Sequence, residues 1–300
     1  MTTQFRRIYE AQVGSLKFSK LDVVFRAVKF LKKEPNTLEF HIFNLTPDHR
    51  AELEGTPEQA IQLSCGYEGL KATGALGAVD DALGALDAVT GGGGGDSKLG
   101  LIFSGDVSEV QNEKDPPNWV THVEAGDGEK AIRTSRINKS FPPGTTKPIV
   151  IAELAKAMKV GIGNSAKAVL DGGNMFEAGQ EFLNGVTVSG PAHRELESLV
   201  RSSDQEMSVQ DGVLQILDRG QPILGLPVIV NPSTGLLGSP TIGDKGVVKF
   251  RALLNPDIVP GIRIVLTTDT VAGAFRAERC EYTGDTLGSD WFVDVEATEL

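Results

Sequence analysis

The sequence is short of the residues from which disulfide frameworks and thiolate metal sites are built. Only two cysteines occur among the 300 residues, Cys65 and Cys280, and no CxxC pair is present. This scarcity excludes a disulfide framework, and a chain of this length can bury a core that needs no covalent staple. We expect each cysteine to be a small buried residue of a strand.

Long apolar runs and excess positive charge are also missing. No stretch of about 18 apolar residues exists, which excludes a membrane-spanning helix. The first residues, MTTQFRRIYE, have no apolar segment typical of a signal peptide. The net charge of −11 argues against a protein that grips nucleic acid by neutralising phosphates. We therefore expect a soluble protein made in a cytoplasm, and solubility alone would explain its acidity.

Motifs that carry chemistry are nearly absent. The four histidines, His41, His49, His122 and His193, make no HxxxH or HExxH pair, and no GxSxG elbow occurs. The segment VGIGNSA (Val160–Ala166) fits G-x-G-x-x-A. A dinucleotide fold has a strand before this pattern, whereas a helical pattern precedes it here, so it predicts a turn that ends a helix.

Acidic residues are so numerous that some pairs occur by chance, since Asp and Glu together number 40. A glycosidase needs two carboxyl groups about 5 to 10 Å apart across a cleft. We interpret Asp80-Asp81, Glu195 and Glu197 as solvated faces, because no helical stretch is long enough for a lysozyme-like module. The sequence therefore predicts no catalytic, no cofactor-binding and no metal-binding residue.

Strand and turn signals are abundant, most of all after Met207. Asp211-Gly212 separates two alternating runs, and Asp-Gly favours a two-residue type I′ hairpin turn. Turn formers fill Asn231–Pro240, but the pair Leu236-Leu237 within it needs a cover. Each of four later apolar runs is too short to make a core alone, so we expect a small closed or nearly closed barrel. These runs are Val247–Leu254, Ile262–Thr268, Ala274–Tyr282 and Trp291–Ala297.

The N-terminal part shows similar patterns. Arg6–Val13 and Leu21–Leu31 are expected to form a first pair of strands, and Pro35–Leu45 a third strand that alternates apolar and polar residues. A short helical turn through Leu53 and a fourth strand, Gln59–Tyr67, follow. Strands resume at Leu99–Val107 and at Trp119–Glu124.

A segment of different composition, Lys71–Lys98, interrupts these strands. It is built from Gly, Ala, Leu and Asp and contains five consecutive glycines, Gly91–Gly95, without the GK[ST] ending of a phosphate loop. Its leucines fall at helical spacing, but each internal glycine costs about 1 kcal/mol against alanine in a helix. A weak amphipathic helix and a mobile loop are both open, and we interpret the segment as an insertion in a hairpin.

The middle of the chain mixes strand and helix patterns. A strand is expected within Lys130–Phe141, and Thr145 or Thr146 precedes an amphipathic helix. A short strand, Val186–Ser189, and a second helix, Gly190–Ser202, follow. The inward face of the first helix comprises Ile151, Leu154, Ala155 and Met158.

Three phrases of the C-terminal part carry a family resemblance. They are GLLGSP (Gly235–Pro240), LNPDIVPG (Leu254–Gly261) and GDTLGSDW (Gly284–Trp291), and the N-terminal IFSGDV (Ile102–Val107) agrees more loosely. Together they resemble the baseplate hub proteins of contractile-tailed bacteriophages, which are related to the hub part of type VI secretion spike proteins. One strand departs from this pattern, because Cys280-Glu281-Tyr282 stands where the family often has a His shortly before the Gly-Asp pair.

The resemblance implies a mainly β fold with an α+β middle. A first barrel-like tube domain would span residues 1–127 with the loop insertion 71–98, a mixed middle region residues 128–240, and a second barrel-like tube domain residues 241–300. In hub proteins the two barrels are related in shape, and three copies form a ring of six barrels.

The implied function is that of a structural baseplate hub and not of an enzyme. Such a hub is a trimeric adaptor that joins the six-fold tail tube to the three-fold spike and lines the DNA channel. The implied partners are two further copies of the chain, the tail tube protein, the central spike protein and other baseplate proteins. DNA would pass without specific binding. The protein would be assembled in the host cytoplasm and reside in the tail baseplate of the virion, without cofactors.

Two functions of other classes remain open. A tail-associated cell-wall hydrolase would need a pair of acids that only the fold brings together. A receptor-binding module would use barrel loops such as Lys71–Lys98. Fold alone does not separate these functions, because barrels host many activities.

Overall fold

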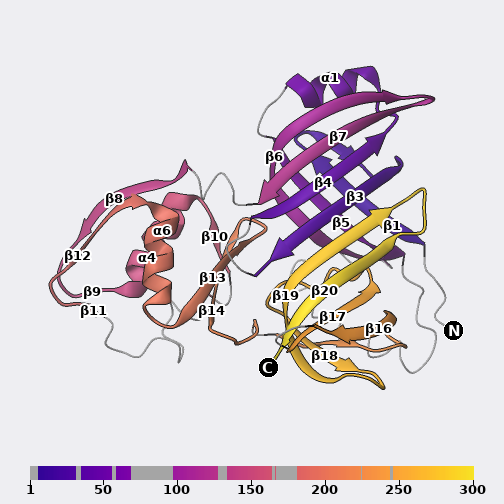
Figure 1. The fold of residues 1–300 in the computed structure, drawn as a ribbon. Coiled ribbons are helices and arrows are strands. Elements are labelled where there is room, and N and C mark those ends of the chain that lie inside the picture. The colour runs from indigo at the N-terminus through magenta and orange to yellow at the C-terminus, as the bar shows by residue number, and fades with distance from the viewer. Residues whose placement is uncertain are drawn as a thin grey trace.

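The computed structural model describes residues 6–31, 35–55, 59–68, 97–127, 134–163, 166, 181–223, 225–243 and 246–300. Strands dominate these residues, and the helices lie mostly in the middle of the chain, so the expectation of a mainly β fold with an α+β middle is confirmed. The interpretation of the glycine-rich segment falls, up to residue 96, outside the described residues. Figure 1 shows a large curved sheet with a smaller mixed unit beside it.

The N-terminal part supplies seven strands to the large sheet. Helix α1 (Pro47–Gly55), which confirms the expected helical turn, connects two of them. The other predicted strands of this part are also present and lie within a few residues of their expected bounds, except that β6 continues past the expected end at Val107 to Asp115. The strands are β1 (Arg7–Val13), β2 (Leu16–Phe18), β3 (Val23–Phe30), β4 (Asn36–Phe43), β5 (Ala60–Glu68), β6 (Ser97–Asp115) and β7 (Asn118–Asp127).

The first two apolar runs do not pair with each other, so that prediction is wrong. Gly14 has φ +57° and closes a tight hairpin, which pairs β1 with the three-residue β2. On its other side β1 pairs with β5, and β3 pairs instead with β4. The chain therefore uses the second run to begin a different part of the sheet.

The C-terminal part supplies the remaining strands of the sheet. The four predicted runs are confirmed as β17, β18, β19 and β20, and the turn-rich phrase before them leads into β16. Leu236 in β16 is buried, as expected, but Leu237 is 38% exposed because successive side chains of a strand face opposite sides of the sheet. The strands are β15 (Val228–Val230), β16 (Leu236–Ile242), β17 (Val247–Leu253), β18 (Arg263–Thr267), β19 (Ala272–Asp285) and β20 (Trp291–Glu299).

Strand β19 joins the two ends of the chain. Along one side it pairs with β20, and along the other it pairs first with β18 and then with β3. The change of partner falls at a β-bulge between Ala277 and Arg279, which bends the strand. The described strands of both chain ends thus belong to one sheet of 13 strands, in the order β16-β17-β20-β19-β3-β4-β7-β6-β5-β1-β2. Strand β18 branches off beside β19, and β15 pairs with the other side of β18.

One hydrophobic core serves both chain ends. Inward-facing residues of the N-terminal and C-terminal strands form a single cluster, in which the rings of Phe25 on β3 and Trp291 on β20 meet edge to face at 5.5 Å between centroids. Both cysteines are buried in strands, as expected, and burial raises the pKa of the Cys280 thiol to about 12. The described strands end at three edges, β16, β2 and β15, and show no closed barrel.

The middle unit has a core of its own. Helix α4 (Lys147–Met158) directly follows Thr146 and packs with α6 (Ala192–Arg201), confirming both predicted helices. Their inward faces bury Leu154, Met158 and Leu196 against β14. The short strands around them are β8 (Arg136–Phe141), β9 (Thr145–Thr146), β10 (Gly161–Ile162), β11 (Glu181–Phe182), β12 (Val186–Pro191), β13 (Gln205–Gln210) and β14 (Val213–Asp218).

Two predicted turns of the middle unit take their expected form. Asp211 and Gly212 both have positive φ, 53° and 73°, as a type I′ turn between β13 and β14 requires. The glycines of VGIGNSA follow helix α4, which ends at Met158 with Lys159 in the left-handed conformation. A helix and not a strand precedes them, so the pattern lacks the setting of a dinucleotide site.

The junction between β3 and β19 leads to a testable prediction. Gly284 lies opposite Phe25, and a Cβ atom there would lie 2.2 Å from the ring. Gly284→Ala is expected to lower the free energy of unfolding by about 1–3 kcal/mol, because the ring has to leave its packed position. Urea unfolding measures this. Gly55→Ala is the matched control, since its Cβ would meet nothing within 4 Å, and an equal loss in both variants would contradict the prediction.

Candidate functional site

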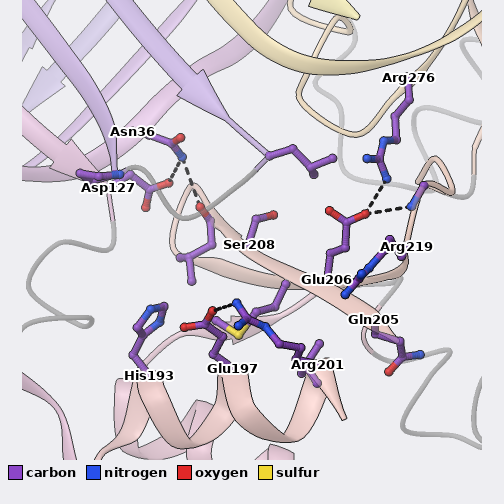
Figure 2. A pocket seen from close by; sticks show the side chains of 16 residues that line it. Asn36, Asp127, His193, Glu197, Arg201, Gln205, Glu206, Ser208, Arg219 and Arg276 are labelled. Atoms are coloured by element: carbon purple, nitrogen blue, oxygen red, sulfur yellow. Dashed lines mark hydrogen bonds and ion pairs between the residues drawn. The ribbon is translucent and has the colours of Figure 1, made fainter. Parts of the chain in front are cut away.

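A cleft of about 550 Å³ lies where the middle unit meets one end of the large sheet. Helix α6 and strand β13 of the middle unit form one wall, and residues that follow β3 and precede β4 contribute to the other. Figure 2 shows the charged side chains that gather around it. Its geometry depends on two polar anchors that hold the middle unit to the sheet.

The first anchor is the tip of the β13–β14 hairpin. Gly212 donates its backbone N–H to Oδ1 of Asp127 at 2.8 Å, and Asp211 donates its backbone N–H to Oδ2 of the same carboxylate. Burial raises the pKa of Asp127, as does the charge of Asp211, whereas the hydrogen bonds from Asn36 and from these backbone groups lower it. A carboxylate at the end of β7 therefore accepts hydrogen bonds from the two backbone N–H groups at the tip of a tight turn.

A buried lysine completes this anchor. Lys29 on β3 is 1% exposed, and its Nζ lies 2.6 Å from Oδ2 of Asp211 and 3.1 Å from the carbonyl oxygen of Ile102. The other oxygen of Asp211 accepts the backbone N–H of Ser104 at 3.0 Å. The Lys29 ammonium is thus buried against two acceptors, while the Asp211 side chain is 21% exposed and accepts from both Lys29 and Ser104, which holds the hairpin tip against β3 and β6.

Asn36 extends the same network at the start of β4. Its amide nitrogen donates to Asp127, to the side chain of Gln210 and to the carbonyl of Val209, and its oxygen accepts the N–H of Phe30. Gln210 in turn donates to the carbonyl of Phe30 at 2.6 Å. We call the contact between the β13–β14 hairpin and the large sheet the joint. Polar groups on each side of this joint form hydrogen bonds with buried polar groups on the other side.

The second anchor is a buried arginine on β19. Arg276 is 4% exposed, and its guanidinium lies 3.1 Å from Glu206 on β13 and 2.6 Å from Glu278. It also donates to the carbonyl of Gln221 at 3.2 Å, while Glu206 accepts the N–H of Gly220. In both anchors the sheet contributes the cation and the β13–β14 hairpin contributes an acid.

The carboxylates that line the cleft are tied to donors. Glu197 pairs with Arg201 on the next turn of α6, Glu206 pairs with Arg276, and Asp127 accepts backbone N–H groups. We interpret them as structural acceptors, since a glycosidase needs a pair of carboxyl groups that face a substrate and not structural donors. The sequence predicted that Glu195 and Glu197 lie on a solvated face. This prediction holds only in part, because the side chain of Glu197 is 20% exposed and lines the cleft.

The residues of the joint were not found from the sequence. Lys29 stands in an apolar strand and Asp127 at the end of another, and neither belongs to a motif. A lysine within a run of buried positions is the one local signal, because lysines are rarely buried without a partner. Of the histidines, only His193 lines the cleft.

His41 and His122 meet on the outer face of the sheet. They are opposite each other on β4 and β7, with ring centroids 4.4 Å apart. Partial burial lowers the pKa of His41, and the neighbouring His122 lowers it further. Among the described residues no group of three or more His, Cys, Asp or Glu side chains is placed to hold a metal ion. Nor does the described part contain a helix of sufficient length and apolarity to cross a membrane.

Comparison with known families decides the identity of this fold. The chain matches the family described as baseplate hub gp41 over residues 17–283, which spans nearly all strands of the large sheet and the whole middle unit. The chain belongs to the baseplate hub gp41 family. The resemblance seen in the sequence is thereby confirmed, and a baseplate hub is a component of the phage tail. No curated protein matches the sequence.

Solved structures of phage tail proteins share the fold of this hub family member. The 43 kDa tail protein of prophage MuSo2 from Shewanella oneidensis is 9% identical, with a TM-score of 0.60 over 97% of this chain and 98% of its own. A tail protein from Neisseria meningitidis MC58 is 8% identical, with a TM-score of 0.62 over 98% and 97%. The Escherichia coli c3393 protein, a type VI secretion component, is 9% identical, with a TM-score of 0.52 over 97% and 76%.

Asp127 provides a test of the joint. In Asp127→Asn one oxygen becomes an NH₂ group, which faces N–H donors of Asn36, Asp211 or Gly212. The free energy of unfolding is expected to fall by about 1–3 kcal/mol, because a buried donor loses its acceptor. Urea unfolding followed by tryptophan fluorescence measures the change. Asp269→Asn, at an exposed turn, should be neutral, and a neutral Asp127→Asn would refute the role given to the anchor.

The histidine pair predicts a dependence on pH. Because the folded-state pKa of His41 lies below the ordinary value of 6.5, its contribution to stability is complete above pH 6.5 and is lost as the pH falls. His41→Gln should therefore lose less stability than the wild type between about pH 8 and about pH 5. His49→Gln, at an exposed position on α1, serves as the control. Parallel pH profiles for His41→Gln and the wild type would be the contrary result.

Proposed function

We propose that this chain is the trimeric adaptor of a phage tail, which joins the six-fold tail tube to the three-fold spike. The observation that carries the proposal is the family match, since it includes strands from both ends of the chain. On this proposal the chain resides in the tail baseplate of the virion, and it binds the tail tube protein, the central spike protein and other baseplate proteins. Assembly would take place in the host cytoplasm, where the partners are made.

The symmetry argument rests on two β units within one chain. We propose that residues 1–127 and 241–300 act as two barrel-like tube domains on either side of the middle region 128–240, and that three copies place six such units around an axis. This is supported by antiparallel strands at both chain ends that run side by side across the β3–β19 pair. Threefold association of such a chain offers a six-fold tube six similar contacts.

The edges of the sheet are the places where the next copy would bind. Strand β16 is one edge, and its side chains Leu237 and Ile242 are 38% and 67% exposed. The other edges are the short strands β2 and β15, and Ile229 on β15 is 56% exposed. Unpaired edges and exposed apolar side chains are surfaces that association covers, and stable subunit interfaces bury at least about 1,000 Å².

We further propose that the ring lines a channel through which DNA passes without specific binding. The net charge of −11 supports this, because an acidic lining does not retain phosphates. Around the β3–β19 junction, exposed cations are paired with acids, so both signs of charge occur there. The ion pairs there are Lys249–Glu296, Arg251–Asp294, Arg26–Glu281 and Arg26–Glu39. A basic lumen in a reconstruction of the tail tip would refute this part.

Solution assembly tests the proposal. The purified chain alone is expected to give a mass of three copies by light scattering, because the edges of one copy need neighbours. With the tail tube and spike proteins of its phage, the complex is expected to contain three copies of this chain. Electron microscopy should then show a ring that binds the tube on one face and the spike on the other. A chain that stays monomeric with both partners present would contradict the adaptor function.

The two alternative functions make different predictions. A cell-wall hydrolase would clear peptidoglycan in a zymogram and lose that activity on substitution of one acid. A receptor-binding module would bind host cells and lose binding on deletion of residues 71–98. The tied carboxylates of the cleft disfavour the first alternative, since each already has a partner.

A further inference from the structure

The cleft between the middle unit and the sheet continues along helix α6. A second hollow of about 400 Å³ adjoins it, because Glu197 and Arg201 line both. Arg194 and Ser202 line the second hollow along the exposed face of the helix. We call the cleft and this hollow together the track. The combined site is elongated, so it suits an extended chain better than a compact molecule.

The two parts of the track differ in chemistry. Its floor is apolar and is formed by side chains from both walls. Its rim carries Arg194 and Arg201 on α6 and Arg219 beyond β14, in a chain whose net charge is −11. The floor comprises Leu31, Pro35, Val200, Met207 and Val209.

The rim arginines can change partners at little cost. Arg201 pairs with Glu197 and Arg219 with Asp204, and the side chains of these arginines are 61% and 58% exposed. Exposed ion pairs contribute little to stability, so a carboxylate from outside can compete for these guanidinium groups. Figure 2 shows the guanidinium of Arg201 directed toward Glu197 on the same helix.

Two buried polar atoms in the wall of the cleft lack partners. Ser208 is 6% exposed and Gln205 is 3% exposed, and neither Oγ of Ser208 nor Oε1 of Gln205 has a hydrogen-bond partner. Ser208 lies on β13 between the two anchors, on the wall that faces the cleft. Buried polar groups without partners are rare in folded proteins, and a bound chain with backbone N–H groups would satisfy them.

We propose that this track binds an extended segment of a partner protein that carries apolar side chains next to acidic ones. The apolar side chains cover Met207 and Val209, the carboxylates bind Arg201 and Arg219, and the backbone of the segment bonds to Ser208. That the partner belongs to the tail rests on the proposed function, but the chemistry of the track does not. An acidic segment is favoured over a nucleic acid, since the apolar floor and the acidic balance of the chain do not suit a phosphate backbone.

Methionine methyl resonances can test this binding in the full chain. The sequence has four methionines, of which Met207 lines the cleft and Met158 lies in the core of the middle unit. The chain is labelled with ¹³C-methyl methionine and titrated with the peptide acetyl-ELELE-amide. We expect a saturable shift of the Met207 resonance and no shift of the Met158 resonance.

Matched peptides and variants decide the outcome. The peptides acetyl-KLKLK-amide and acetyl-ESESE-amide should leave Met207 unchanged, because the first carries the wrong charge and the second has no apolar side chains. The double variant Arg201→Ser with Arg219→Ser should weaken the binding by about fivefold, as expected for two partly exposed ion pairs. Arg263→Ser, at an exposed position of β18, is the control and should not weaken it.

Several results would overturn the inference. These are an unchanged Met207 resonance at millimolar acetyl-ELELE-amide, an equal response to acetyl-KLKLK-amide, and binding that the double variant retains. A chain that binds the peptide but never forms a trimer would remove the adaptor proposal and keep this site. A trimer that joins tube and spike without binding the peptide would do the reverse.

Discussion

The whole structure depends on the backbone pairing of β3 with β19. Residues about 250 positions apart in sequence, such as Phe30 and Arg279, are partners in this ladder, and Trp291 packs against Phe25 beneath it. Because loop closure must precede such contacts, this pairing is expected to form late and to limit the folding rate. Neither chain end completes its core without the other, so a truncated half would expose apolar residues of the shared cluster.

The second constraint is that the middle unit is attached by polar contacts. Its apolar cluster is separate from that of the sheet, and the joint consists of Lys29 with Asp211, Asp127 with the hairpin tip, and Arg276 with Glu206. Directional bonds fix an orientation where apolar packing would permit sliding. The cleft persists between these anchors because the two surfaces are held at set points and not pressed together along their length.

The sequence predicted the local parts of this structure well. Asp211-Gly212 predicted the type of turn that is present, and the alternation in Pro35–Leu45 predicted a strand. The spacing of Leu154 and Met158 predicted a helix. The pairing of β1 was mispredicted, since periodicity reports which face is buried and not which strand is the neighbour. The site was missed for the same reason. Lys29, Asp127, Asp211 and Arg276 lie in four separate parts of the chain, and only the folded sheet brings them together.

The shape of β16 has a consequence for the free subunit. Its register shifts between Leu237 and Thr241, and Pro240, which has no N–H, lies within that shift. An uninterrupted ladder cannot be added to such a border, so the irregularity guards a newly made chain against stacking into amyloid-like fibres. Copies can then meet at this edge through a shape-matched contact, as in the proposed trimer, but not through an open-ended ladder of strands.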